Sequence, residues 1–264
     1  MMIDILLTND DGYQAIGFYP LLRELAKKFN VIAVAPDRKR SWQGKAITCY
    51  NDLEVNKVKL EEFEVYAVSG TPADCVQLGL YDLAPSRPKF VVSGINIGLN
   101  AGHGRILSSG TAGAAMEAAI DGTKALASSL HLTWDHDKEI NYFDRAFYHI
   151  YENPAKITAK LVEITINANL KDDVDLISVN IPFAADMNTP CEVTDIARDK
   201  YGKLFAKQGE KYRHIGSPPN TKGYPNGTDL NALENERISV TPVSLDLTSK
   251  ESKKELSDLI KIKW

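Results

Sequence analysis

Short apolar runs alternate with segments of helical periodicity along the first half of the chain, and this alternation limits the possible folds more than any other feature. Residues 3–7 are almost continuously apolar, as expected for a strand that is covered on both faces. Leu21, Leu25 and Phe29 follow at helical spacing, and Val31–Ala35 is a second buried strand. A strand–helix–strand order with short connections predicts a right-handed parallel βαβ unit.

The rest of the chain repeats this order with one interruption. Residues 46–68 mix apolar and charged side chains, which indicates exposed antiparallel strands before the chain re-enters the core. Thr71-Pro72-Ala73-Asp74 predicts a capped helix start, because Thr71 can cap and Asp74 can return a bond to the cap. Further strands are expected at 90–93, 125–130, 175–181 and 238–243, and further helices at 111–120 and 249–260. The sequence therefore predicts an open, mostly parallel α/β sheet.

The chain changes character after Pro182. Residues 186–230 are polar and rich in proline and glycine, which interrupts regular structure. We therefore expect residues 1–182 to form the α/β core and residues 183–264 to form a C-terminal arm with a strand and a helix. Leu256, Leu259 and Ile260 at the end of this arm need a cover. An arm that packs on a neighbouring subunit provides one, so a homodimer is expected.

Composition excludes several classes of partner. The 264 residues carry a formal net charge of −4 without a block of lysine and arginine, so a nucleic-acid partner is not expected. No apolar run reaches the roughly 18 residues of a membrane helix, and the N-terminus lacks the features of a signal peptide. Cys49, Cys75 and Cys191 form no CxxC pair, and we expect all three to be buried. A cytoplasmic location is predicted.

Polar residues follow the predicted strands where each one ends. Asn9, Asp10 and Asp11 follow the first strand, Ser41 lies after the second, and Asn96 follows the strand at 90–93. The carboxyl ends of parallel strands meet at one edge, where open α/β sheets bind ligands. Asp10, Asp11, Ser41 and Asn96 together offer only oxygen ligands, which suit Mg²⁺, Mn²⁺ or Ca²⁺ and disfavour zinc or copper. An alternative is that Asp10 or Asp11 caps a helix that begins near Gly17.

A second candidate site precedes the alanine-rich helix at 111–120. Ser109, Gly110 and Thr111 lie at its start, where free backbone N–H groups and the helix dipole attract anions. The alternative is an ordinary serine N-cap followed by a glycine for close packing. No lysine follows the glycines as in a Walker P-loop. His103, in the neighbouring glycine-rich loop, is either a phosphate contact or an exposed loop residue.

Two classes of function could use a ligand site at this edge without phosphate chemistry. One is a nicotinamide-dependent oxidoreductase, but the glycine spacing in residues 94–104 differs from GxGxxG. The other is a noncatalytic module that binds or senses nucleotides. Such a module rarely needs Asp10, Asp11, Ser41 and Asn96 together, so this class is also disfavoured.

Several ordered blocks give the chain a resemblance to a known family. Ile5–Gly12, Ala35–Ser41, Ser69–Val76, Ser93–Asn96 and Ser109–Thr111 resemble successive motifs of the survival-protein (SurE) 5′-nucleotidase family. The resemblance implies a Rossmann-like three-layer sandwich with a C-terminal arm exchanged between subunits of a homodimer or tetramer. It also implies hydrolysis of nucleoside 5′-monophosphates to nucleoside and phosphate, and in some members of short polyphosphate.

The resemblance carries site residues as well. It implies that Asp10, Asp11, Ser41 and Asn96 hold one divalent cation per subunit, Mg²⁺ or Mn²⁺, with Asp10 and Asp11 as the catalytic pair. Asn9, Ser109, Gly110 and Thr111 are expected to hold the substrate phosphate, so that loss of the Thr111 hydroxyl should impair substrate binding more than metal binding. The sequence departs from the family at Gly104, where an acidic residue is usual, at Ser108, where an aromatic one is usual, and at Trp42, where a small one is common.

Overall fold

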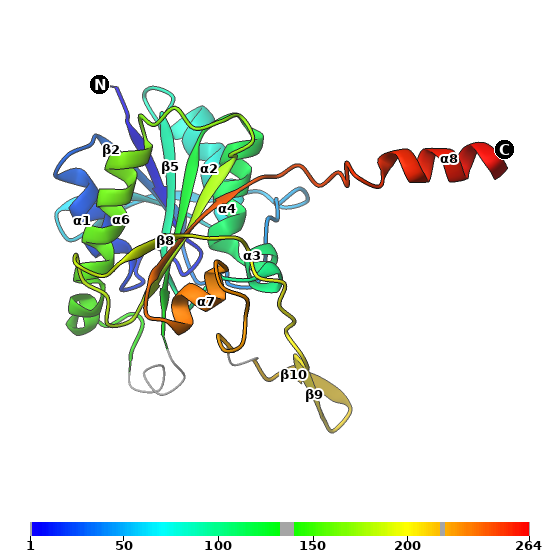
Figure 1. Cartoon of the computed structure of the whole chain (residues 1–264). Helices are drawn as coiled ribbons and strands as arrows, with labels where there is room; N and C mark the ends of the chain where they lie inside the picture. The colour runs from blue at the N-terminus through cyan, green and yellow to red at the C-terminus, as the bar shows by residue number, and fades with distance from the viewer. Residues whose placement is uncertain (1, 133–139, 217–219, 264) are drawn as a thin grey trace.

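A nine-stranded sheet runs through the centre of the molecule, in the order β3-β4-β2-β1-β5-β6-β7-β11-β8 (Figure 1). The computed structural model describes residues 2–132, 140–216 and 220–263. The middle strands run parallel, which confirms the predicted sheet. These strands are β1 (Ile5–Thr8), β2 (Val31–Pro36), β4 (Phe63–Val68), β5 (Phe90–Ile97), β6 (Ala125–His131) and β7 (Leu176–Pro182). The predicted exposed hairpin is β3 (Val55–Leu60) with β4, an antiparallel pair.

Helices cover both faces of this sheet and give the predicted three-layer architecture (Figure 1). One face carries α1 (Phe18–Ala26) and α6 (Glu152–Thr165), and the other carries α2 (Pro72–Leu78) and α4 (Gly110–Ile120). Successive side chains of a strand point to opposite faces. In β1, Ile5 and Leu7 accordingly pack on the side of α1 and α6, whereas Leu6 packs on the side of α2 and α4. The shorter helical segments are η1 (Gly79–Leu83), α3 (His103–Ser108) and η2 (Arg145–Tyr151).

The start of α2 has the predicted capping box. The Asp74 amide donates to Thr71 Oγ1 at 3.1 Å, and the Thr71 amide donates to Asp74 Oδ2 at 2.8 Å. Asp74 Oδ1 also accepts from the Thr48 amide at 3.0 Å. The cap therefore satisfies helix donors and fixes the connection that leads from β2 back to β3.

Part of the C-terminal region belongs to the main sheet. β11 (Ile238–Val243) pairs antiparallel with β7, and β8 (Cys191–Val193) pairs with β11. In the sequence, a hairpin of β9 (Phe205–Gln208) and β10 (Lys211–His214) and the helix α7 (Asp229–Glu234) lie between β8 and β11. This hairpin projects from the body, and α8 (Lys253–Lys263) lies at the end of a long extended segment (Figure 1). The boundary at residue 182 stays a prediction.

The cysteine prediction is wrong for two residues. Cys75 is buried in α2, but Cys49 and Cys191 are exposed. Cys49 lies in the connection before β3 and Cys191 begins the three-residue edge strand β8, so neither segment has a layer packed over it. None of the described helices is long and apolar enough to span a membrane.

Candidate active site at the carboxyl edge of the sheet

Two adjacent carboxylates lie buried directly after β1. Asp10 is 3% exposed and Asp11 is 1% exposed. The turn that carries them continues through Gly12, whose φ of 93° favours glycine, and a Cβ there would lie 3.0 Å from the backbone of Arg38. The turn after β1 thus packs directly on the segment after β2.

Asp11 follows β1 and contacts residues at the ends of two other strands, β2 and β5. Its Oδ2 accepts from the amide of Ile97, at the end of β5, at 3.0 Å. Its Oδ1 accepts from Ser41 Oγ at 3.3 Å and lies 3.5 Å from Lys39 Nζ. The Lys39 ammonium also lies 5.4 Å from the centre of the Tyr142 ring. The predicted proximity of Asp11 and Ser41 is therefore present.

Asp10 faces the start of α4. Thr111 Oγ1 donates to Asp10 Oδ1 at 2.5 Å. A Cβ at Gly110 would lie 2.7 Å from Asp10 Cβ, so glycine is needed for this close approach. The start of α4 and the paired carboxylates are therefore in direct contact.

Burial dominates the electrostatics of the pair. Loss of solvent, followed by repulsion from Asp11, raises the pKa of Asp10 to about 7. Burial also raises the pKa of Asp11, although the Lys39 ammonium opposes the rise. Two carboxylates that are difficult to ionise side by side in this way fit a divalent cation, which stabilises both charges.

Asn96 is the predicted oxygen donor that comes from β5. β5 carries an irregularity between Ser93 and Asn96 in its pairing with β6, close to the edge. The Asn96 amide nitrogen donates to the Gly98 carbonyl at 2.6 Å, which leaves Oδ1 as the ligand end. Within the described ranges, no three His, Cys, Asp or Glu side chains form a metal-binding group. Asp10, Asp11, Ser41 and Asn96 all carry oxygen atoms, the kind of ligand that suits Mg²⁺ or Mn²⁺.

Helix capping was the alternative role for the aspartates and for Ser109, and it applies only to Ser109. The N-cap residue of α1 is Gly17 without a side-chain capping bond, so neither aspartate caps that helix. Ser109 Oγ accepts from the Ala112 amide at 3.0 Å and does cap α4. Asn9 exchanges two hydrogen bonds with the backbone of Gly12, at 2.9 and 3.2 Å, and so holds the turn that carries the aspartates. His103 is exposed, with Nδ1 3.0 Å from the Ala197 carbonyl.

The rim of the site is a small cleft of about 220 Å³, lined in part by Asp11, Gly12 and Lys39. Asp37 and Arg38 also line the cleft, so charged groups of both signs border it. Its position at the carboxyl edge of an α/β sheet, with polar groups around it, matches the usual place of a ligand site.

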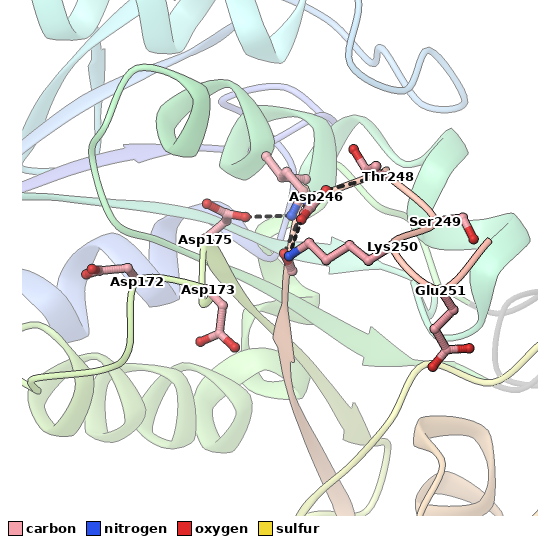
Figure 2. Close-up of a pocket in the computed structure, with 10 residues that line it drawn as sticks. Asp172, Asp173, Asp175, Asp246, Thr248, Ser249, Lys250 and Glu251 are labelled. Carbon is pink, nitrogen blue, oxygen red and sulfur yellow. Dashed lines mark hydrogen bonds and ion pairs between the residues drawn. The ribbon is translucent and has the colours of Figure 1, made fainter. Parts of the chain in front are cut away.

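A larger cleft of about 940 Å³ lies elsewhere, at the base of the C-terminal arm (Figure 2). Carboxylates dominate its lining, including Asp172, Asp173, Asp175 and Asp246. Lys250 is paired with Asp246 at 2.7 Å, and the Leu245 amide donates to Asp175 at 2.5 Å (Figure 2). This cleft would repel an anion, so the smaller one is the better candidate for phosphate chemistry.

The chain also matches a known family. The family profile described as "Survival protein SurE" matches residues 5–203. The chain belongs to the survival protein SurE family. The matched range contains all the candidate ligands at the edge of the sheet.

Similar proteins cover almost the whole chain. "5′-nucleotidase SurE" of Methanocaldococcus jannaschii is 40% identical over 262 residues, covering 94% of each chain. "5′-nucleotidase SurE" of Methanocella arvoryzae is 34% identical over 270 residues and covers both chains fully. The crystal structure of the SurE protein from Aquifex aeolicus superposes with a TM-score of 0.79 at 31% identity, covering 97% of this chain and 99% of that one. The predicted fold and the predicted SurE membership are confirmed.

Two features of this SurE site were not predicted from the sequence. Lys39 lies beside Asp11, and Thr111 is bonded to Asp10 rather than only available to a ligand. The signal for Lys39 was present, since it lies between the second strand end and Ser41 in a basic run. The Thr111 contact had no local signal, because it depends on how α4 packs against the turn after β1.

Proposed function

We propose that this protein is a phosphomonoesterase that hydrolyses nucleoside 5′-monophosphates to nucleoside and phosphate with one divalent cation, Mg²⁺ or Mn²⁺, per subunit. The observation that carries the proposal is the pair of buried carboxylates, Asp10 and Asp11, directly beside the N-terminus of α4. The name "5′-nucleotidase SurE" of the two relatives supports this substrate class. Short polyphosphate, which presents a similar terminal phosphoryl group, is proposed as a further substrate.

Four residues of the edge would hold the cation. Asp10 and Asp11 supply carboxylate oxygens, Ser41 its hydroxyl and Asn96 its amide oxygen. When bound, such a cation neutralises phosphoryl oxygens and lowers the pKa of water. Thr111 and the Ile97 amide fix one oxygen each of Asp10 and Asp11, so both carboxylates have defined orientations before substrate arrives.

The start of α4 would hold the phosphate. The first N–H groups of a helix lack partners within it, so those of Gly110 and Thr111 are suited to phosphate oxygens. Ser109 caps the same turn and keeps it in position. Asn9 contributes by holding the turn after β1. Lys39 adds a positive charge 3.5 Å from Asp11, which offsets the negative charge of the incoming phosphate.

Direct attack by water is the proposed reaction course. The sequence contains no Asp-x-Asp-x-Thr motif of the phosphoaspartate enzymes. Catalysis then depends on positioning and charge stabilisation, as is usual for phosphoryl transfer. One of the two aspartates, Asp10 or Asp11, would orient the attacking water while both hold the cation.

A homo-oligomer is part of the proposal. The extended segment after β11 exposes Leu247, and α8 exposes Leu256, Leu259 and Ile260. A single chain leaves this apolar row in water, although contact with a second copy would cover it. The observation supports exchange of the arm between subunits, in a dimer or in a tetramer built from dimers.

Phosphate release from AMP and GMP tests the proposed function. We expect release with Mn²⁺ or Mg²⁺, loss with EDTA, and recovery when the cation is restored. A panel of mononucleotides and short polyphosphates then ranks the substrates. A noncatalytic nucleotide module would bind AMP without releasing phosphate under any of these conditions, and that result would refute the proposal.

A further inference from the structure

The loop after Ser41 is fixed to the start of the phosphate-site helix. The Gly44 amide donates to the Ser108 carbonyl at 2.9 Å, one residue before the N-cap of α4. A Cβ at Gly113, in the first turns of α4, would lie 2.5 Å from the Gly44 carbonyl oxygen. Backbone therefore packs on backbone here. The loop lies between the proposed cation ligand Ser41 and the proposed phosphate site.

This loop carries Trp42, the residue that directly follows Ser41. Its backbone is in the left-handed region, with a φ of 65°, where a bulky side chain is rare. Such outliers concentrate at functional sites. Its side chain is 46% exposed, so much of the indole remains accessible to solvent. A large apolar ring therefore lies one residue from a proposed cation ligand.

Two other aromatic side chains hold the indole in place. The Tyr201 ring centre lies 5.7 Å from that of Trp42, in a tilted arrangement. The His214 ring, from β10, meets Trp42 edge-on at 5.0 Å. These distances are typical of favourable aromatic pairs. The indole is supported from the segment before the hairpin and from the hairpin itself.

Tyr201 is itself anchored at the site. Its hydroxyl lies 2.6 Å from Ser108 Oγ and is also bonded to the Gly104 carbonyl. A Cβ at Gly104 would lie 3.0 Å from the Tyr201 ring, so a side chain there would displace the ring. Gly104, Ser108 and Trp42, the three departures from the family pattern, thus meet at one tyrosine.

We propose that Trp42, supported by Tyr201 and His214, forms the surface on which the nucleobase of the substrate stacks. The inference rests on the proposed function, because it places the base of a nucleoside 5′-monophosphate whose phosphate lies at α4. The ribose carries the base several ångströms away from the phosphorus, and the exposed indole of Trp42 lies one residue beyond Ser41, held by a tyrosine that is bonded to Ser108 just before α4. Every base has a π-face, so stacking on Trp42 gives affinity with little preference among bases.

Binding of AMP and of ribose 5-phosphate to the EDTA-treated full-length protein tests the proposal. The two ligands share the phosphate and the ribose, and only AMP has a base. We expect Trp42→Gly to weaken AMP relative to ribose 5-phosphate by about 5- to 150-fold, the range measured for loss of one stacking contact. Glycine suits the left-handed backbone at this position, so the variant should fold. Trp42→Phe should retain much of the preference for AMP.

Tyr50→Ala provides the matched control, since Tyr50 is an aromatic residue that is 95% exposed and contributes nothing to the site. It should leave the ratio of the two affinities unchanged. An equal loss for both ligands in Trp42→Gly, or no loss for either, would overturn the proposal. If AMP binding responds to Trp42 but no phosphate is ever released, the stacking surface stands and the proposed hydrolysis fails. If phosphate is released but the ratio of the two affinities is unchanged in Trp42→Gly, the proposed hydrolysis stands and the stacking surface fails.

Discussion

The hydroxyl of Thr111 donates a 2.5 Å hydrogen bond to the carboxylate of Asp10, although 101 residues separate the two in sequence. This bond links the proposed phosphate site at the start of α4 to the proposed cation site after β1. Because Thr111 occupies Oδ1 of Asp10, the other oxygen is the one available to a cation. Gly110 makes the contact possible by allowing the helix to approach the Asp10 side chain.

This relationship changes the expected effect of Thr111→Val. From the sequence, loss of the hydroxyl should impair substrate binding more than metal binding. The structure adds the support of Asp10, so we expect Thr111→Val to raise both the KM and the Mn²⁺ concentration needed for half-maximal rate. A lost bond to a charged group costs about 1–3 kcal/mol, which corresponds to roughly 5- to 150-fold. Titration of the rate with Mn²⁺ at fixed AMP, and with AMP at fixed Mn²⁺, measures both effects.

Thr111→Ser is the control for that experiment. It keeps the hydroxyl and should retain most of the affinity for Mn²⁺ and for AMP. A valine variant whose Mn²⁺ requirement is unchanged would show that Thr111 does not support Asp10 in the working enzyme.

The two aspartates differ from structural carboxylates in their expected effect on stability. We expect Asp10→Asn and Asp11→Asn to reduce kcat/KM by at least about 10²-fold, comparable to loss of a main electrostatic group in other enzymes. In EDTA, Asp10→Asn should leave the melting temperature unchanged or higher, because it removes one of two mutually repulsive buried charges and the bond from Thr111 needs only one oxygen. Phosphate-release kinetics and thermal melts check both parts. Asp52→Asn, at an exposed position, is the control and should change neither kcat/KM nor the melting temperature. Near-normal turnover of Asp11→Asn at saturating Mg²⁺ would contradict the proposed role of Asp11 as a cation ligand.

The sequence predicted the parallel sheet well because its strands are buried on both faces and so appear as continuous apolar runs. The edge residues followed from topology, since parallel strands bring Asp11, Ser41 and Ile97 to one edge regardless of loop detail. β11 was predicted at Ile238–Val243, but its place beside β7 was not, because strand order depends on contacts far apart in sequence.

Contacts between distant loops were beyond prediction for the same reason. Nothing near Trp42 or Ser108 indicates that Tyr201 lies between them, since the contact depends on the path of residues 183–204 across the sheet. The exposure of Cys49 and Cys191 was missed because residue type describes an average tendency, whereas burial depends on whether another layer covers the segment.

A buried carboxylate outside the site gives a pH-dependent prediction. Asp229, at the start of α7, accepts from the Gly102 amide at 2.7 Å and from the Ala197 amide at 2.9 Å. Asparagine offers one acceptor oxygen in place of two, so Asp229→Asn should leave one of these amides without a partner. We expect a loss of about 1–3 kcal/mol, seen as a lower melting temperature.

The pH dependence of that loss follows from burial, which raises the pKa of Asp229 above its ordinary value despite the backbone donors. The folded state then holds the proton more tightly than the unfolded chain does, so the contribution of Asp229 to stability is full below pH ~4 and declines as the pH rises beyond it. The gap in melting temperature between wild type and Asp229→Asn should therefore narrow from pH 4 upward. A gap that widens over this range would show that the amide donors outweigh burial.

The segment after β11, together with α8, should determine the oligomeric state without contributing to the sheet. β11 pairs with β7, so truncation at Pro182 would strip the sheet of β11 and β8 and should give an aggregating product. A chain that ends at Asp246 keeps both strands and removes only the extended segment and α8. We expect this shorter chain to remain folded and to sediment as a monomer, whereas the full-length chain should sediment as a dimer or tetramer of its 29.2 kDa subunit.

Replacing Leu256 and Leu259 with lysine in the full chain should also give a monomer, because charge would replace the apolar row. Lys254→Glu, a charge change at an exposed position of the same helix, serves as the control and should keep the oligomer. A full-length protein that sediments as a monomer at micromolar concentration would refute arm exchange.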